Sequence, residues 1–505
     1  MTQRSDSSPA TPATPATRAL EPRRSLVRVG VSRVDITPPV GIYHRMWGAA
    51  KHDRSTGIHR PLTATVLAIG PQASKGSDGS PSGQPALIAI ALDHCLFWSA
   101  EMKSWIESVA RSAGVDPASI QVFFSHTHGA GLMGLERVSL PGGDLIPDYL
   151  RTIADEVARG VRDAIGGMAP ATITFETGRC ALATNRDYLD PQSGSYVCGF
   201  NPDRPADDTL ILGRVTSPDG KTLATLLNYA CHPTTLAWDN TLISPDYVGA
   251  TREVIESQTG APCFFIQGAS GDVGPRHGFV GDCGVADANG RQLGHAALAT
   301  LEGMFPPDQR FCYAGPVVSG ATIGTWHFEP IPQPDSSRHA VWRQATCRVD
   351  LPLREDLPDR GELIEEQRHW QQKQAEAAAA GDDQAAADCR AMVERATRRL
   401  VRVAHLPEGK TFPYQATLFR MGDAVWVPLN GEHYNCLQVA LRDRFPKQTL
   451  LIATLVNGSD VWYLPDAESY GKGLYQEEAS ILAEGSLEML IDAIAKTIDA
   501  LFDRP

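Results

Sequence analysis

Residues 86–92 read Ala-Leu-Ile-Ala-Ile-Ala-Leu and residues 120–128 read Ile-Gln-Val-Phe-Phe-Ser-His-Thr-His, and these two stretches decide the fold class. The first is a continuous apolar run of strand length, typical of a strand covered on both faces. The pattern over 98–113 predicts a helix that ends at Gly114, and the apolar start of the second stretch predicts another strand. Together they predict a βαβ unit whose second strand ends in two histidines. Ligand sites in such sheets gather at these strand ends.

The same alternation of strand and helix continues along the chain. Residues 222–229 predict a strand that leads into His232. Ser244-Pro245 predicts the N-cap and first residue of a helix. Residues 264–266 predict the next strand, and a glycine-rich loop, 267–275, follows it. We therefore expect an α/β fold of the mixed α+β kind, with mixed sheets covered by helices and a metal site at the strand ends.

Charge and composition exclude several classes of partner. The chain has 505 residues, with 46 Lys and Arg against 59 Asp and Glu, so its formal net charge is −13. Nucleic acid binding needs clustered basic residues, so we expect no nucleic acid partner. No apolar run approaches the length of about 18 residues that a membrane span needs, so we expect no stable membrane insertion. The N-terminus has no apolar h-region, which predicts a cytoplasmic enzyme.

Three segments describe the expected domain organisation. Residues 1–25 are rich in Ser, Thr, Pro and Ala and predict a disordered tail, with a transit peptide as the alternative. Residues 26–505 predict one large catalytic domain, because no convincing boundary or internal repeat occurs. Within it, residues 354–404 are highly charged and Ala-rich and predict a helical hairpin insertion. Its charges form either a solvated face or a functional lid.

His126 and His128 are the strongest local signal for chemistry. On a strand, residues i and i+2 point to one face about 6.6 Å apart. Two imidazoles at that spacing can lean toward one metal ion at about 2.0–2.1 Å. The alternative is a pair of histidines that are hydrogen-bonded in a loop.

His232 and Glu432 share the setting of a strand, a small residue and then a ligand-type side chain. Two His and one carboxylate form a standard catalytic zinc set with a position left open for water. The alternative interpretation of each residue by itself is that His232 is a core or loop histidine and that Glu432 is a cap at a strand end or a solvated side chain. Asp272, in the glycine-rich loop, is predicted either to orient a histidine or accept a proton, or else to form a turn. Ser270 does not lie in a G-x-S-x-G motif, so we disfavour a serine hydrolase.

These motifs, in this order, resemble the catalytic domain of the neutral, non-lysosomal ceramidase family. The resemblance covers roughly residues 28–485. The matching segments are residues 29–39, 57–66, 125–129, 228–233, 267–275, 431–432 and 457–463, together with Tyr475.

The resemblance implies a zinc ion (Zn2+) held by His126, His232, Glu432 and Tyr463. The segment before Tyr463 carries one residue more than the family's pattern. The resemblance further implies that two other residues line the scissile carbonyl, namely His128 and Tyr475.

The chain departs from the family in two ways. Gly274 stands where the ceramidases have a serine proposed as catalytic, and we expect no C-terminal immunoglobulin-like domain of the kind that the family carries. We therefore predict a zinc-dependent hydrolase that attacks the amide bond of a small-molecule or lipid-like N-acyl substrate other than ceramide. The alternatives are another metal-dependent enzyme on the same site (an esterase, a deacetylase or a carbohydrate-active enzyme) and a non-catalytic binding homologue.

Overall fold

The larger of the two main sheets carries the predicted βαβ unit. The computed structural model describes residues 18–72, 85–332, 338–404 and 406–502. Within them, an eight-stranded sheet has the order β14-β12-β11-β7-β2-β4-β5-β6, parallel at its two ends and antiparallel between them. Its strands are β2 (Arg23–Asp35), β4 (Thr63–Pro71), β5 (Leu87–Leu92), β6 (Ile120–Phe124), β7 (Ala169–Arg179), β11 (Thr209–Thr216), β12 (Thr222–Tyr229) and β14 (Cys263–Gln267).

A four-stranded sheet packs face to face against the first. The alternating side chains of both sheets form one apolar core, in which Phe123 and Phe264 contact Trp426 at ring-centroid distances of 6.0 and 6.3 Å. The strand order is β18-β19-β20-β22, with the last pair parallel. The strands are β18 (Trp342–Pro352), β19 (Thr411–Met421), β20 (Ala424–Pro428) and β22 (Thr449–Ala453).

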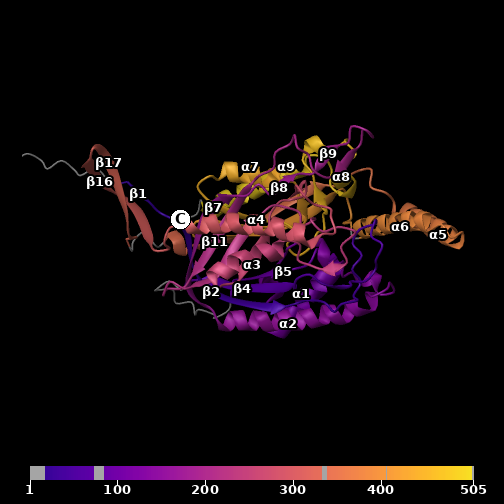
Figure 1. Ribbon diagram of the computed structural model, residues 1–505, viewed down its shortest axis with the longest axis horizontal. Coiled ribbons are helices and arrows are strands. Elements are labelled where there is room, and N and C mark those ends of the chain that lie inside the picture. The colour runs from indigo at the N-terminus through magenta and orange to yellow at the C-terminus, as the bar shows by residue number, and fades with distance from the viewer. Residues whose placement is uncertain (1–17, 73–84, 333–337, 405, 503–505) are drawn as a thin grey trace, which may run out of the picture.

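Helices cover the outer faces of both sheets, so the body has helix, sheet, sheet and helix layers (Figure 1). The eight-stranded sheet is covered by α1 (Ser99–Ala113), α2 (Ile146–Gly166), α3 (Tyr247–Thr259) and α4 (Cys283–Glu302). The four-stranded sheet is covered by α7 (Cys436–Arg444) and α9 (Ser486–Phe502). The expected mixed α/β fold, with mixed sheets covered by helices, is confirmed.

Short strands complete the fold around these layers. A three-stranded sheet of β1 (Ala19–Leu20), β16 (Gln309–Ser319) and β17 (Ala321–Pro330) extends to one side of the body in Figure 1. The remaining strands form pairs: β3 (Gly57–Ile58) with β13 (Leu242–Ile243), β8 (Ala183–Asn185) with β15 (Val273–Pro275), β9 (Asp187–Leu189) with β10 (Tyr196–Cys198), and β21 (Glu432–His433) with β23 (Tyr463–Leu464). A short helix, α8 (Tyr475–Ala479), follows the last pair.

The βαβ unit forms as predicted. Strands β5 and β6 are parallel neighbours with Leu92 opposite Phe124, and α1 connects them. Gly114 ends α1 with φ 71°, a left-handed conformation that glycine adopts without steric cost. The residues that follow β6 therefore lie at the carboxyl end of this parallel pair of strands.

The eight-stranded sheet curls until its two edges meet. Strand β14 at one edge contacts β6 at the other. The segment after β22 closes this edge, since Val456 forms an antiparallel bridge with Phe123. This curl brings the carboxyl ends of β6 and β12, which are far apart in the strand order, to one place.

Two predictions at element boundaries were wrong. The disordered tail was predicted to run to residue 25, but β1 and the start of β2 lie within it, while residues 1–17 lie outside the described part of the chain. Ser25 donates a hydrogen bond to Met421 O and the Arg24 amide donates one to Asp423, so contacts distant in sequence hold this polar segment. The N-cap of α3 is Asp246 and not Ser244, because the Asp246 carboxylate accepts from the Tyr247 amide, whereas the Ser244 hydroxyl accepts from the Asp246 amide before the helix begins.

Two helices occupy the segment in which a helical hairpin was expected. They are α5 (Arg360–Ala379), which begins with a capping box, and α6 (Asp383–Val403), and the pair extends from the body in Figure 1. Ion pairs from α6 to the loop after β2, Arg390 with Asp53 and Glu394 with Arg45, tie the hairpin to the body. In the described part of the chain, no helix combines the length and the apolar character needed to cross a membrane.

A buried ion pair fixes the end of β5. Both guanidinium nitrogens of Arg252 donate to the Asp93 carboxylate, at 2.9 and 2.6 Å. Burial raises the pKa of Asp93, but the charge and hydrogen bonds of Arg252 outweigh it, so the pKa lies below its ordinary value. This stabilisation is therefore present above the ordinary pKa of an aspartate and is lost as the pH falls through the lower, folded-state pKa.

We expect Arg252→Met to lower the free energy of unfolding by about 3–5 kcal/mol, because it leaves the Asp93 carboxylate buried without its partner. The matched control is Arg179→Met, which breaks an ion pair with Asp208 whose side chains are 76% and 38% exposed. The control should cost less than about 1 kcal/mol. Urea denaturation measures both, and equal losses would contradict the assignment.

Candidate metal centre

His126 and His128 lie just beyond the end of β6. The strand stops at Phe124, so the predicted strand spacing of the two histidines was wrong. The backbone of His126 is in the left-handed region, with φ 66°, and His128 begins a 3-10 turn. A non-glycine residue in that region is strained and needs support from its surroundings. The His126 amide obtains it by donating to His94 O at 2.9 Å. The two rings nevertheless face one region, with centroids 5.1 Å apart.

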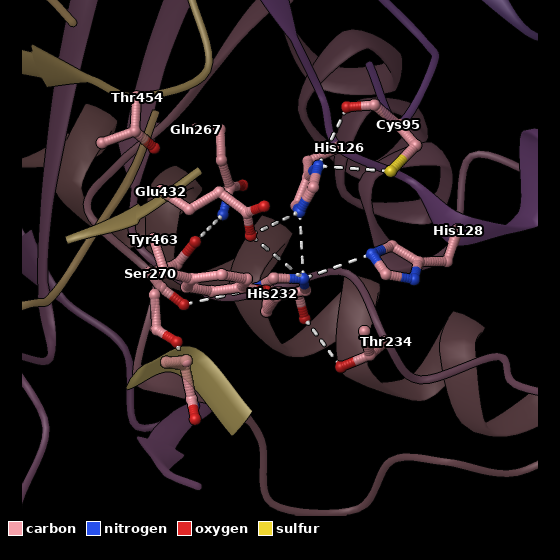
Figure 2. Close-up of polar contacts among 12 residues, drawn as sticks. Cys95, His126, His128, His232, Thr234, Gln267, Ser270, Glu432, Thr454 and Tyr463 are labelled. Atoms are coloured by element: carbon pink, nitrogen blue, oxygen red, sulfur yellow. Dashed lines mark hydrogen bonds and ion pairs between the residues drawn. The ribbon is translucent and has the colours of Figure 1, made fainter. Parts of the chain in front are cut away.

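His232 follows β12 and meets His126 across the curled sheet. Their Nε2 atoms lie 3.0 Å apart, and both side chains are buried (Figure 2). The opposite nitrogens face backbone carbonyls: His126 Nδ1 donates to Cys95 O at 2.9 Å and His232 Nδ1 donates to Ser270 O at 3.3 Å. Since a carbonyl can only accept, these bonds leave both Nε2 atoms to bind a metal ion.

Glu432 brings a carboxylate to the same point. Its Oε2 lies 3.3 Å from His126 Nε2 and 4.0 Å from His232 Nε2. This oxygen is buried and accepts no hydrogen bond from any residue that the structure describes. Glu432 is held there because β21 pairs with β23, which sets Glu432 opposite Tyr463. The Tyr463 hydroxyl donates a hydrogen bond to the Glu432 carboxylate and accepts one from Arg186 at 3.1 Å.

These groups fit a divalent metal ion. The ligand atoms of His126, His232 and Glu432 lie within 4.8 Å of one another. Two nitrogens bound tetrahedrally to zinc at about 2.0–2.1 Å stand about 3.4 Å apart. The observed 3.0 Å between the Nε2 atoms is close to that value. A cation between them would also satisfy the Glu432 oxygen that has no donor. Two neutral nitrogens and one carboxylate form the donor set that catalytic zinc takes.

The charges around the site favour neutral imidazoles at two of its three histidines. Burial lowers the pKa of His232 well below its ordinary value, and the nearby charge of Arg186 lowers it further. Burial also lowers the pKa of His128, with a further contribution from His126. For His126, burial acts in the same direction, but Cys95 and Glu432 outweigh it and raise the pKa. His126 therefore favours the charged imidazolium, which lies 3.3 Å from the Glu432 carboxylate as an ion pair.

A cavity of about 460 Å³ opens above the three ligand residues. His128 and Tyr475 line it, as do all four proposed ligands. His128 Nε2 lies 3.2 Å from His232 Nε2, whereas Tyr475 is 44% exposed and its ring lies 5.8 Å from that of Tyr463. Most of the remaining wall is apolar and consists of Met46, Trp47, Leu96, Trp98, Leu132, Val197, Phe279 and Trp462.

Asp272 is not among the residues that line this cavity. Its carboxylate accepts from the Asn435 amide at 2.6 Å and from Asn185 Nδ2 at 3.2 Å. Burial, and then the charge of Asp187, raise its pKa to about 7. The structure thus favours the alternative prediction for Asp272, in which it holds the glycine-rich loop in shape.

Two residues of the site escaped sequence analysis. Arg186 is buried, lines the cavity, and donates to Gly271 O at 2.7 Å as well as to Tyr463. Cys95 lines the cavity too, with its thiol sulfur 3.5 Å from His126 Nδ1. Neither lies in a local pattern that indicates a site. The one signal for Cys95 is its position just after β5, the strand that pairs with β6.

Comparison with solved structures identifies the fold. A crystal structure of neutral ceramidase from Pseudomonas aeruginosa matches with a TM-score of 0.61 at 14% sequence identity, covering 95% of this chain and 75% of that one. The chain has a ceramidase-like fold. A second structure, of a ceramidase complexed with C2, matches with a TM-score of 0.61 at 13% identity, covering 96% of this chain and 76% of that one. No family model and no curated protein matches the sequence. The resemblance read from the motifs is therefore confirmed for the fold.

We expect His126→Ala and His232→Ala each to reduce bound zinc from about one ion per chain to less than a tenth of that, because each removes one of the few ligands of the site. The measurement is metal content by mass spectrometry after dialysis against a weak chelator. The control His327→Ala, on exposed β17, should keep the wild-type content. Unchanged zinc in both ligand variants would contradict the site.

Proposed function

We propose that this chain is a zinc-dependent hydrolase that cleaves the amide bond of an N-acyl substrate with an apolar portion. The observation that carries the proposal is the convergence of His126, His232 and Glu432 at the base of an apolar cavity. The fold agrees with it, since the two similar structures are ceramidases, whose name denotes the hydrolysis of an N-acyl lipid.

His126, His232 and Glu432 are the proposed zinc ligands, with Tyr463 as the fourth. Burial, and then Glu432, raise the pKa of Tyr463, so its phenol keeps a proton that it donates to Glu432. That bond holds the hydroxyl beside the ligand carboxylate. A zinc ion in this site would polarise a carbonyl and lower the pKa of a water molecule from about 15.7 toward 7.

The protein's own groups orient the substrate and move protons. Tyr475 and His128 line the cavity from different elements and would donate hydrogen bonds to the oxygen of the scissile carbonyl. The neutral imidazole of His128 would accept the proton that the attacking water loses and pass it to the leaving amine. We assign this transfer to His128 because it reaches the ligand nitrogens and Asp272 does not line the cavity. Arg186 holds the Tyr463 hydroxyl and adds a positive charge at the base of the cavity.

The shape of the cavity supports an apolar substrate. Aromatic and aliphatic side chains form most of its wall, and many of its polar groups are the proposed ligands and their neighbours His128, Arg186 and Tyr475. A volume of about 460 Å³ accommodates a ligand of ordinary drug-like size. A carbohydrate would need polar groups along the wall, so this arrangement favours the amide or ester of an apolar acid or amine over a glycoside.

Gly274 leaves room for a side chain. A Cβ atom built there would meet Thr234 Oγ1 at 3.6 Å and His232 Cβ at 3.9 Å, both ordinary contacts. A serine Cβ at this position would therefore fit beside Thr234, His232 and Arg186 without a clash. The proposed chemistry does not depend on that serine, because water is the nucleophile.

The proposal is tested by assaying zinc-loaded and chelator-treated protein on N-acyl amides of increasing acyl length, matched esters and glycosides. We expect amide hydrolysis that requires zinc and becomes faster with a longer acyl chain. Hydrolysis of the esters alone would favour an esterase on the same site. One bound zinc per chain without turnover of any substrate would favour a non-catalytic binding protein.

We expect Tyr475→Phe and His128→Gln each to lower kcat by about 10²–10³, because each removes a hydrogen bond to the transition state. Zinc content should stay at the wild-type level, since neither residue is a proposed ligand. The control Tyr313→Phe lies on β16, outside the cavity, and should leave kcat unchanged. Steady-state kinetics on the best amide measures all three, and wild-type kcat in both cavity variants would contradict their roles.

A further inference from the structure

A second cavity, of about 400 Å³, lies next to the catalytic one. Trp98 and Trp462 line both cavities, and their rings are 5.4 Å apart. None of the three histidines or Glu432 reaches the second cavity. The two tryptophans are therefore a shared wall between two distinct spaces.

Arg402, near the end of α6, lines the second cavity and has no ionic partner. The residue is only 7% exposed, yet its buried Nε has no hydrogen-bond partner in the described ranges. Its guanidinium carbon lies 4.6 Å over the ring of Trp462. Arg402 lines this cavity and not the catalytic one. A buried charge without a partner costs several kcal/mol of desolvation, so such groups are rare.

The acidic residues around Arg402 are engaged with other groups. Both Glu478 oxygens accept from Arg395, at 3.0 and 2.6 Å. Asp356 is paired in the same two-pronged way with Arg354. Asp460, on the opposite wall, accepts from Ser99 and from Asn430. The neighbouring charge of Arg398 is positive and adds to the cost of burying Arg402.

Ser459 is a second polar group without a partner in the same cavity. Its hydroxyl is buried and has no hydrogen-bond partner among the residues described. One guanidinium and one hydroxyl, both able to donate and both unused, thus line one space. Lys103 adds an exposed ammonium at the rim. The rest of the wall is largely apolar, with Phe97, Val401, Phe412 and Ile481.

We propose that this second cavity binds an apolar monocarboxylate. The carboxylate accepts hydrogen bonds from the Arg402 guanidinium and the Ser459 hydroxyl, and the apolar body packs against the aliphatic and aromatic wall. A guanidinium matches the two oxygens of a carboxylate in a fork, and such charge-assisted bonds are among the strongest in proteins. A single buried cation balances one negative charge, which favours a carboxylate over a phosphate dianion.

The proposal also bears on the catalytic reaction. The acid released by hydrolysis of an apolar N-acyl amide has this chemistry, so the second cavity would bind that product as well. This extension alone rests on the proposed function. The binding site itself is independent of zinc and of turnover.

The test is calorimetric titration of sodium octanoate into full-length protein freed of zinc by a chelator, which excludes binding of the carboxylate to the metal. We expect one saturable site per chain. 1-Octanol, which has the same chain without the charge, should bind at least tenfold more weakly. Inorganic phosphate should bind more weakly as well. Tighter binding of phosphate than of octanoate would overturn the choice of ligand.

Arg402→Met keeps the length of the side chain and removes the charge, and we expect it to weaken octanoate binding at least tenfold. Ser459→Ala should weaken it about threefold to tenfold. The control Arg368→Met removes an exposed charge from α5, outside both cavities, and should change the affinity less than twofold.

Thermal unfolding distinguishes a variant that has lost octanoate binding from a variant that has lost its fold. Because the Arg402 charge has no partner, Arg402→Met should melt at a temperature no lower than that of the wild type. Octanoate should raise the melting temperature of the wild type but not that of the variant. Equal octanoate affinity in the wild type and Arg402→Met would overturn the proposal. So would a loss of affinity in Arg368→Met that matches the loss in Arg402→Met.

Discussion

Two imidazole nitrogens 3.0 Å apart, with a carboxylate oxygen that has no donor beside them, are the constraint on which the rest of this structure depends. Such an arrangement is unfavourable unless a proton or a cation lies between the groups. The ligands come from β6, β12 and the segment after β20, so the large sheet must curl and the small sheet must pack onto it. The fold can therefore be understood as the arrangement that brings these strand ends together.

The orientation of the ligands depends on the backbone more than on side chains. Carbonyls of Cys95 and Ser270 fix the two rings through their Nδ1 atoms, and the pairing of β21 with β23 fixes Glu432 beside Tyr463. The buried pair of Asp93 and Arg252 holds the chain just before Cys95. Since these contacts are made within the chain itself, they orient the candidate ligands independently of the metal, which reduces the cost of binding one.

The sequence was sufficient to predict a candidate site residue where that residue closely follows a strand. An apolar run followed shortly by His126, His232 or Glu432 locates the side chain at a strand end. Ligand sites in such sheets gather at the strand ends. The sequence was insufficient to predict contacts between residues that are distant along the chain. Arg186 acts through Tyr463, 277 positions away, and the loop of Asp272 turns its carboxylate away from the cavity to the Asn435 amide. No local pattern encodes contacts of this kind.

The helical insertion is more than a solvated face, because α6 contributes to both cavities. Arg398 lines the catalytic cavity and Arg402, about one turn later, lines the second. A purely structural hairpin gains nothing from a guanidinium buried against Trp462 without an acceptor, since methionine would fill the same space without the desolvation cost. The unpaired charge is explained if a ligand supplies the acceptor. At 14% identity the likeness to ceramidase covers the fold alone, so the ligands of both cavities have to be inferred from such unsatisfied groups.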